Sequence, residues 1–173
     1  MQVLLSRQIL RRLQRELRRA GRQEIGGLLM GEHVCDETFR VVDVSIQRSG
    51  GSDVCFIRDP KDHQAQLNSF FARTGADYAR FNYLGEWHSH PSFQPLPSST
   101  DLRTMQSIVE NPDVGVNFAL LLIVRRSKTA TIEASAVAFR KHAAPLAVPL
   151  IIEEFRAESD SAFLKWLRRV FKL

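Results

Sequence analysis

The segment around residues 81–91 constrains the fold more than any other part of the sequence. The run 81–89 predicts a strand, and Pro91 ends it because proline offers no amide hydrogen to a sheet. Side chains two residues apart on a strand point to the same side. His88 and His90 are therefore predicted to face one point at the end of this strand.

A helix is predicted after the proline-rich loop, from Ser98 or the next serine to about Glu110. Asp101 falls in its first turn, and the helix can fold back over the strand end. Two histidines and one carboxylate are the ligand set of a catalytic zinc site with a fourth position for water. A purely structural interpretation also exists, because Ser98 and Asp101 fit a helix capping box and the histidines could line a core. Both interpretations of Ser98 can hold together.

Helices and strands alternate along the rest of the chain, and no repeat or low-complexity segment is present. The predicted order is helix, two strands, helix, strand, helix, two strands and helix, which favours an α+β fold around one sheet. The predicted helices cover 6–20, 60–73, 98–110 and 153–173, and the predicted strands cover 25–30, 38–46, 81–89, 117–124 and 129–139.

The other histidines have no partner at metal-ligand spacing and are predicted to lie on the surface: His33, His63 and His142. Trp87 should point away from the histidine pair and into the core.

The length of 173 residues predicts one domain with a substantial core, and 44% apolar composition excludes a disordered chain. The net charge of +5 is unevenly placed. Residues 1–22 carry seven arginines against one glutamate, and residues 161–173 carry four basic residues and no acid. The middle of the chain is net acidic. The arginines have few aromatic neighbours, which makes nucleic-acid binding a weak hypothesis.

The sequence predicts neither a membrane span nor export. The uncharged stretch 143–152 is short and broken by two prolines, and Arg7 interrupts the apolar start of the chain. Cys35 and Cys55 are predicted to be free thiols in a reducing compartment. We therefore expect a cytoplasmic protein.

The pattern His-Ser-His-Pro at 88–91, followed by Ser98 and Asp101, resembles the JAMM motif of the JAB/MPN+ zinc metallopeptidases. Glu24 and the glycine-rich run after it match the glutamate that completes the family's site. The resemblance spans about 24–139 and implies an α+β JAB/MPN domain, a curved mixed sheet flanked by helices and similar to cytidine deaminases. Deaminase chemistry itself is excluded, because the sequence lacks His-x-Glu and Pro-Cys-x-x-Cys.

The resemblance divides the chain into three parts. Residues 1–22 would form a basic amphipathic helix packed on the domain, 23–140 the JAB/MPN catalytic core, and 141–173 a C-terminal segment with an amphipathic helix. The small size and the lack of a long insertion between 109 and 118 resemble stand-alone bacterial JAB proteins.

The resemblance also implies a mechanism. Zn²⁺ held by His88, His90 and Asp101 would lower the pKa of a bound water. Glu24 would take the proton of that water and pass it to the leaving amine. Ser98 would donate a hydrogen bond to the oxyanion.

By chemistry alone the identity of the base stays open, since Glu32 and Glu86 are rival acids and Glu86 shares the strand face of the histidines. The glycines after Glu24 favour that residue through the resemblance.

The implied function is an isopeptidase or peptidase that cleaves after the C-terminal tail of a ubiquitin-like protein. The extended tail would pair with an exposed strand edge. The substrate would be that protein or its conjugate, and E1- and E2-like conjugation enzymes of a bacterial antiphage system are implied partners. The alternatives are processing of a sulfur-carrier precursor, a scaffold without catalysis, or a basic module that binds nucleic acid or another partner. The two basic ends either pack on the body or bind an acidic partner.

Overall fold

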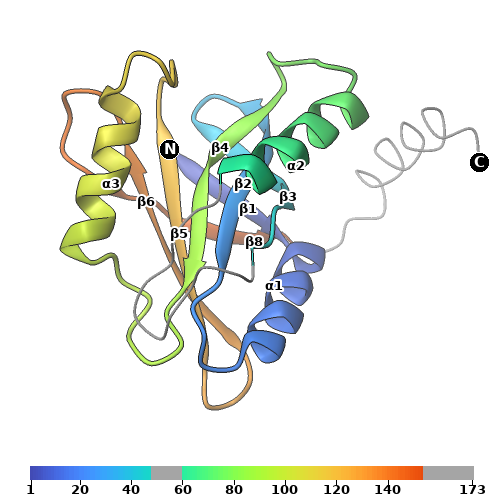
Figure 1. Ribbon diagram of the computed structural model, residues 1–173, viewed down its shortest axis with the longest axis vertical. Helices are drawn as coiled ribbons and strands as arrows, with labels where there is room; N and C mark the ends of the chain where they lie inside the picture. The colour runs from blue at the N-terminus through green and yellow to red at the C-terminus, as the bar shows by residue number, and fades with distance from the viewer. Residues whose placement is uncertain (48–59, 154–173) are drawn as a thin grey trace, which may run out of the picture.

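The computed structural model describes residues 1–47 and 60–153, which form one mixed sheet with helices on both faces (Figure 1). The strands follow the order β7-β6-β5-β4-β2-β3-β1-β8 across the sheet. Along the chain the elements are β1 (Gln2–Ser6), α1 (Arg7–Ala20), β2 (Gly26–Cys35), β3 (Thr38–Val44), α2 (Pro60–Arg73), β4 (Phe81–Ser89), α3 (Ser99–Glu110), β5 (Ala119–Arg126), β6 (Ile132–Phe139), β7 (Leu146–Ala147) and β8 (Leu150–Glu153).

The helix predicted over 6–20 is present as α1. Ser6 caps its N-terminus, where the side-chain oxygen accepts a hydrogen bond from the Ile9 amide at 3.2 Å. Gly21 ends it with φ of 64°. Leu13 and Leu17 are buried against the sheet, so the arginines between them are left on the outer side.

Strand β5 lies inside the sheet and is buried on both faces. Leu120 and Leu122 pack with α1 in the main core, whereas Leu121 and Ile123 pack with Met105 of α3. This alternation explains why the strand is a continuous apolar run. Helix α2 packs on the same side as α3, through Phe70, Met30 and Phe81.

The α+β class is confirmed, but three short strands were not predicted. β1 pairs in parallel with both β3 and β8, and β7 pairs with β6. Local periodicity cannot detect such strands, because β1 and β8 come from opposite ends of the described chain and each is only a few residues long. Of the predicted C-terminal helix, the structure describes only Glu153, which is the last residue of β8. The rest of that predicted helix lies outside the described residues, and so does Cys55.

Two side-chain predictions have opposite outcomes. Trp87 is buried as predicted, with 1% of its surface exposed, and its Nε1 donates to the carbonyl oxygen of Ser45 at 2.9 Å. The surface prediction for His63 is wrong: 3% of it is exposed, and its Nδ1 lies 3.0 Å from Ser45 Oγ. Polar neighbours in the sequence misled the prediction, because successive helix residues point in different directions. Among the described residues, no helix is long and apolar enough to span a membrane.

The side of the sheet to which the end of β4 directs its histidines depends on a β-bulge earlier in the strand. Leu29 of β2 pairs with Gly85, but Met30 pairs with Tyr83, so β4 contains one extra residue at this point. Gly85 has φ of 147°, and a Cβ atom there would lie 2.0 Å from the Leu120 carbonyl oxygen of β5. This position therefore requires glycine both for its backbone conformation and for the close approach of β5.

We expect Gly85→Ala to destabilise the protein by roughly 2 kcal/mol more than Gly75→Ala. Both glycines have positive φ, but a Cβ atom at Gly75 would meet no atom within 4 Å. Urea unfolding of the two variants beside the unchanged protein measures the difference. Equal losses of unfolding free energy would mean that the contact with β5 has no energetic role.

Candidate metal centre

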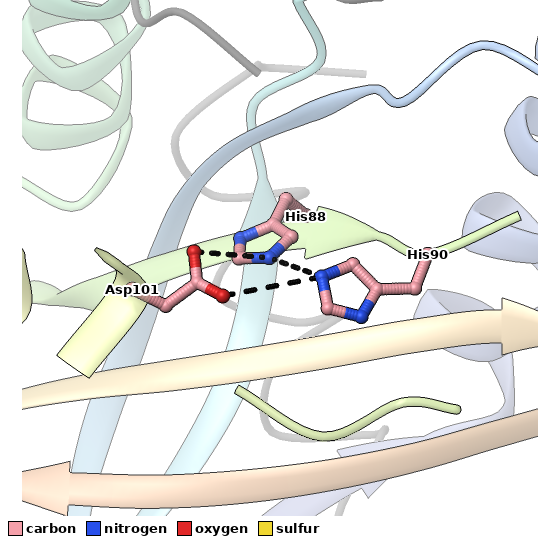
Figure 2. Close-up of side chains that lie close together, drawn as sticks. All are labelled: His88, His90 and Asp101. Atoms are coloured by element: carbon pink, nitrogen blue, oxygen red, sulfur yellow. Dashed lines mark hydrogen bonds and ion pairs between the residues drawn. The ribbon is translucent and has the colours of Figure 1, made fainter. Parts of the chain in front are cut away.

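His88 and His90 lie on the same side of the sheet at the end of β4. His88 pairs with Gly26 of β2 and Ile123 of β5, and the His90 amide donates to the Val124 carbonyl at 2.9 Å, so the backbone stays extended past the strand end. The two Nε2 atoms are 3.0 Å apart (Figure 2). The convergence predicted from strand alternation is therefore present in the structure.

Ser89, between the two histidines, points to the opposite side and fixes the strand. Its Oγ accepts a hydrogen bond from the Ile25 amide at 3.0 Å, and its own amide donates to the Ile25 carbonyl at 2.8 Å. Sequence reasoning assigned no role to this serine. Its position between two same-side residues is the signal that could have found it.

Asp101 reaches the histidines from the first turn of α3 (Figure 2). Its Oδ1 lies 3.6 Å from His88 Nε2, and its Oδ2 lies 4.0 Å from His90 Nε2. Ser98 forms the capping box with it: the Asp101 amide donates to Ser98 Oγ at 3.1 Å, and the Ser98 amide and hydroxyl both donate to Asp101 Oδ2 at 2.7 Å. The capping and site interpretations of these two residues thus hold at the same time.

The loop before α3 orients the second histidine. His90 Nδ1 lies 3.0 Å from the carbonyl oxygen of Gln94. A carbonyl can only accept, so Nδ1 carries the proton in this contact and Nε2 presents its lone pair. A histidine ligand held by a carbonyl through its other nitrogen is the usual arrangement at protein metal sites.

These donors fit a small divalent metal ion. One ligand atom from each of His88, His90 and Asp101 lies within 4.8 Å of the others. Tetrahedral bonds of roughly 2.0–2.2 Å would separate neighbouring ligand atoms by about 3.3–3.6 Å, which falls inside the observed range of 3.0–4.0 Å. Two imidazoles, one carboxylate and an open side match the donor set of a catalytic zinc ion.

Glu24 lies beside this cluster because of the pairing between β2 and β4. Gly26 is opposite His88, and Ile25 is bonded to Ser89, so the same register continued past the strand ends would bring Glu24 opposite His90. Residues opposite each other in an antiparallel pair project to the same side. The side chain of Glu24 is buried, with 5% of its surface exposed.

The rival acids have other partners. Both oxygens of Glu32 bind arginines, Arg40 at 2.6 Å and Arg80 at 2.6 Å. Glu86 Oε1 accepts a hydrogen bond from the Tyr83 hydroxyl at 3.4 Å. The pKa of Glu24, by contrast, is affected by both His90 and Asp101, which shows that its carboxyl lies close to the cluster.

Comparison with known proteins identifies the family. Residues 6–140 match the family described as prokaryotic homologs of the JAB domain. The chain belongs to this family. The match includes α1 and confirms the resemblance seen in the sequence.

This JAB domain is similar in sequence to two proteins with named activities. It is 34% identical over 114 residues to the CD-NTase/cGAS isopeptidase of Vibrio cholerae, a match that covers 60% of this chain and 62% of the relative. It is 36% identical over 84 residues to the ubiquitin carboxyl-terminal hydrolase RPN11 of Saccharomyces cerevisiae, covering 49% of this chain and 26% of that protein. The chain thus matches less than two thirds of the length of either relative.

The fold of the JAB domain also has a solved counterpart. The solution structure of protein DSY2949 from Desulfitobacterium hafniense matches with a TM-score of 0.66 at 18% identity, covering 90% of this chain and 96% of that one. At this level of identity the similarity concerns the fold, and it supports the curved mixed sheet predicted for the domain.

Burial shifts the pKa values of two groups at this JAB site, His88 and Glu24. Burial lowers the pKa of His88 to about 4, with a further lowering from His90, although Asp101 acts in the opposite direction. Near neutral pH the imidazole is therefore uncharged, which is the form that binds metal. Burial raises the pKa of Glu24, Asp101 raises it further, and His90 opposes both.

The metal-free protein should lose stability as the pH falls from about 6.5 toward 4, through the protonation of His88. In that window the unfolded chain binds a proton that the folded protein excludes, so stability rises with pH. The raised pKa of Glu24 works in the opposite direction, so the effect is isolated by comparing the protein with its His88→Gln variant in urea unfolding with chelator. The variant should show a weaker dependence on pH, whereas the exposed control His142→Gln should not. Identical pH profiles for all three would contradict a buried neutral His88.

Proposed function

We propose that this JAB domain is a zinc-dependent isopeptidase or peptidase that cleaves after the C-terminal tail of a ubiquitin-like protein. The observation that carries the proposal is the convergence of His88, His90 and Asp101 beside the buried carboxyl of Glu24. The names of the two relatives support it, since one is called an isopeptidase and the other a ubiquitin carboxyl-terminal hydrolase.

In this proposal His88, His90 and Asp101 hold zinc, which when bound would act as a Lewis acid toward water and the scissile carbonyl. The chain itself supplies the rigid frame. His88 is held within the sheet on both sides, His90 by Gln94, and Asp101 by the capping box. Such anchoring keeps the donor atoms in place when substrate enters.

Glu24 is proposed as the general base and acid. Burial raises the pKa of this carboxyl toward neutral pH, and a group whose pKa lies nearer the working pH can both accept and return a proton. It would take a proton from the attacking water and deliver it to the amine that leaves the tail. Its burial and its electrostatic interaction with His90 and Asp101 support this role.

Ser98 is proposed to act in two stages. Before reaction its hydroxyl donates to Asp101 Oδ2 and so positions that carboxylate. As the carbonyl becomes tetrahedral, rotation of the hydroxyl would direct the same hydrogen toward the oxyanion. The capping bond from the Asp101 amide to Ser98 Oγ can persist during this rotation, because it uses a lone pair.

The biological setting belongs to the same proposal. The name of the Vibrio relative joins an isopeptidase with a CD-NTase, which supports a bacterial antiphage conjugation system as the place of action. Conjugates made by E1- and E2-like enzymes would then be the substrates, and a ubiquitin-like precursor would be cut by the same chemistry.

Glu24→Gln should retain zinc and lose at least roughly a hundredfold in cleavage rate, because the amide cannot accept the proton. His88→Ala should lose both zinc and activity. The assay uses a ubiquitin-like protein joined through its tail to a reporter, with and without chelator, and metal content is measured by mass spectrometry.

Two further variants sharpen this assay. Glu110→Gln changes an exposed acid at the end of α3 and should cleave as the unchanged protein does. Glu86→Gln tests the rival acid and should also retain activity. A fully active Glu24→Gln beside an inactive Glu86→Gln would show that the base is assigned to the wrong residue, and cleavage unaffected by chelator would contradict the metal centre.

A further inference from the structure

Three adjoining hollows form a groove along α1, between this helix and the β5–β6 hairpin. The first, of about 190 Å³, shares Arg18 and Arg126 with the second, of about 270 Å³. The second shares Arg11 and Gln14 with the third, of about 600 Å³. We call these three neighbouring hollows together the α1 groove.

One end of the α1 groove lies behind the end of β4, on the α1 side of the sheet. The first hollow is lined by Ser89 and Pro91, which flank His90, and by Gln23, which precedes Glu24. The groove therefore reaches the chain neighbours of His90 and Glu24 on the α1 side of the sheet, whereas the histidines themselves face the α3 side.

The half of the groove nearest the metal centre is strongly basic. Exposed guanidinium groups of Arg11, Arg15 and Arg18 line it from α1, and Arg126 lines it from β5. Within the described ranges 1–47 and 60–153, Arg11, Arg18 and Arg126 have no ion pair with a carboxylate.

The other arginines of the same elements are mostly paired. Arg12 binds Asp43, Arg19 binds Glu16 at 3.1 Å, and Arg125 binds Glu133 at 2.6 Å. Arg15, in the groove, has one contact to Glu16, at 3.7 Å. Unneutralised positive charge is thus concentrated in the groove, where it would attract an acidic ligand.

The far half of the groove is apolar. The largest hollow is lined mainly by aliphatic side chains from β1, α1, β6 and β8, and its polar lining residues are Arg7, Arg11, Gln14 and Thr131. The aliphatic residues are Leu5, Leu10, Ile132, Ala134, Leu150 and Ile152. A bound chain would therefore place acidic groups near the metal centre and a large apolar side chain further away.

The dimensions suit an extended polypeptide. Helix α1 has 14 residues and is about 21 Å long at a rise of roughly 1.5 Å per residue; six extended residues span about 20 Å. Alternate side chains of an extended chain are about 6.6 Å apart, close to the roughly 5.4 Å between arginines one helical turn apart.

Nucleic acid is the less suitable occupant. Among residues 1–47 and 60–153, no aromatic residue lines any of the three hollows, whereas proteins that bind single strands stack bases on aromatic rings. A small anion would fill only the basic half and leave the apolar half unused.

We propose that the α1 groove binds an extended acidic segment of the protein substrate, with an apolar residue of that segment in the far hollow. This inference rests on the proposed function for its substrate and names the specificity of the same site. From the end of the groove at Gln23 and Pro91, the substrate chain would pass around the end of β4 to the scissile bond.

Binding is tested first without catalysis, in chelator. A labelled peptide with a block of glutamates followed by leucine should bind, and its affinity should fall with added salt. Arg18→Gln/Arg126→Gln should weaken it roughly tenfold or more, whereas the control Lys141→Gln/Arg103→Gln, which removes two exposed charges elsewhere, should not. Equal affinity of the two double variants, or tighter binding of an oligothymidine strand than of the peptide, would overturn the proposal. Urea unfolding verifies that each variant is folded.

Cleavage is tested second, with fusions that keep the residues at the scissile bond constant. The block of glutamates and leucine is placed on one side of the bond or the other, and matched fusions carry glutamines instead. In one of the two positions the acidic fusion should be cleaved roughly tenfold more efficiently, and Arg18→Gln/Arg126→Gln should remove this preference. If the acidic and glutamine fusions are cleaved equally at both positions, the groove inference is overturned while the proposed function stands. If no fusion is cleaved, the proposed function is contradicted together with the substrate assignment, and the peptide measurement still decides whether the groove takes an acidic chain.

Discussion

The antiparallel pairing of β2 with β4 is the interaction on which the site depends. It holds the end of β4, where His88 and His90 lie, and its register, continued past the strand ends, would bring Glu24 opposite His90. A shift of one residue would turn Glu24 to the α1 side of the sheet. The register is supported by the irregularity at Gly85 and by the bonds between Ile25 and Ser89. The placement of Glu24 relative to the histidines is thus governed by backbone pairing rather than by flexible side chains.

The two faces of the sheet carry different kinds of residue near this pairing. On the α3 side, His88, His90 and Asp101 form a polar cluster around a buried imidazole. On the α1 side, Trp87 and the leucines of α1 form the main core. Helix α1 contributes its apolar stripe to that core and its arginines to the groove, so the charge at the N-terminal end of the chain is compatible with a packed, structural helix.

Sequence reasoning reached the parts of the site that depend on short-range geometry. Strand alternation brought His88 and His90 together, and helix capping chemistry placed Asp101, because each rule acts within a few residues. Glu24 was different: its relation to His90 depends on a pairing between distant segments, so only the family resemblance singled it out. The edge strands β1 and β8 were missed for the same reason, and the burial of His63 depends on a tertiary contact with Ser45. Patterns over a few residues do not predict contacts between residues that are distant in the sequence.

The central claim is that His88, His90 and Asp101 hold one metal ion while Glu24 stays unbound beside it. Anomalous diffraction at the zinc edge, from crystals grown with zinc, tests it most directly. We predict one strong peak bonded to the Nε2 atoms of both histidines and to a carboxylate oxygen of Asp101, with the Glu24 carboxyl close by but outside the coordination sphere. A peak bonded to Glu24, or zinc bound at any other set of residues, would contradict the account.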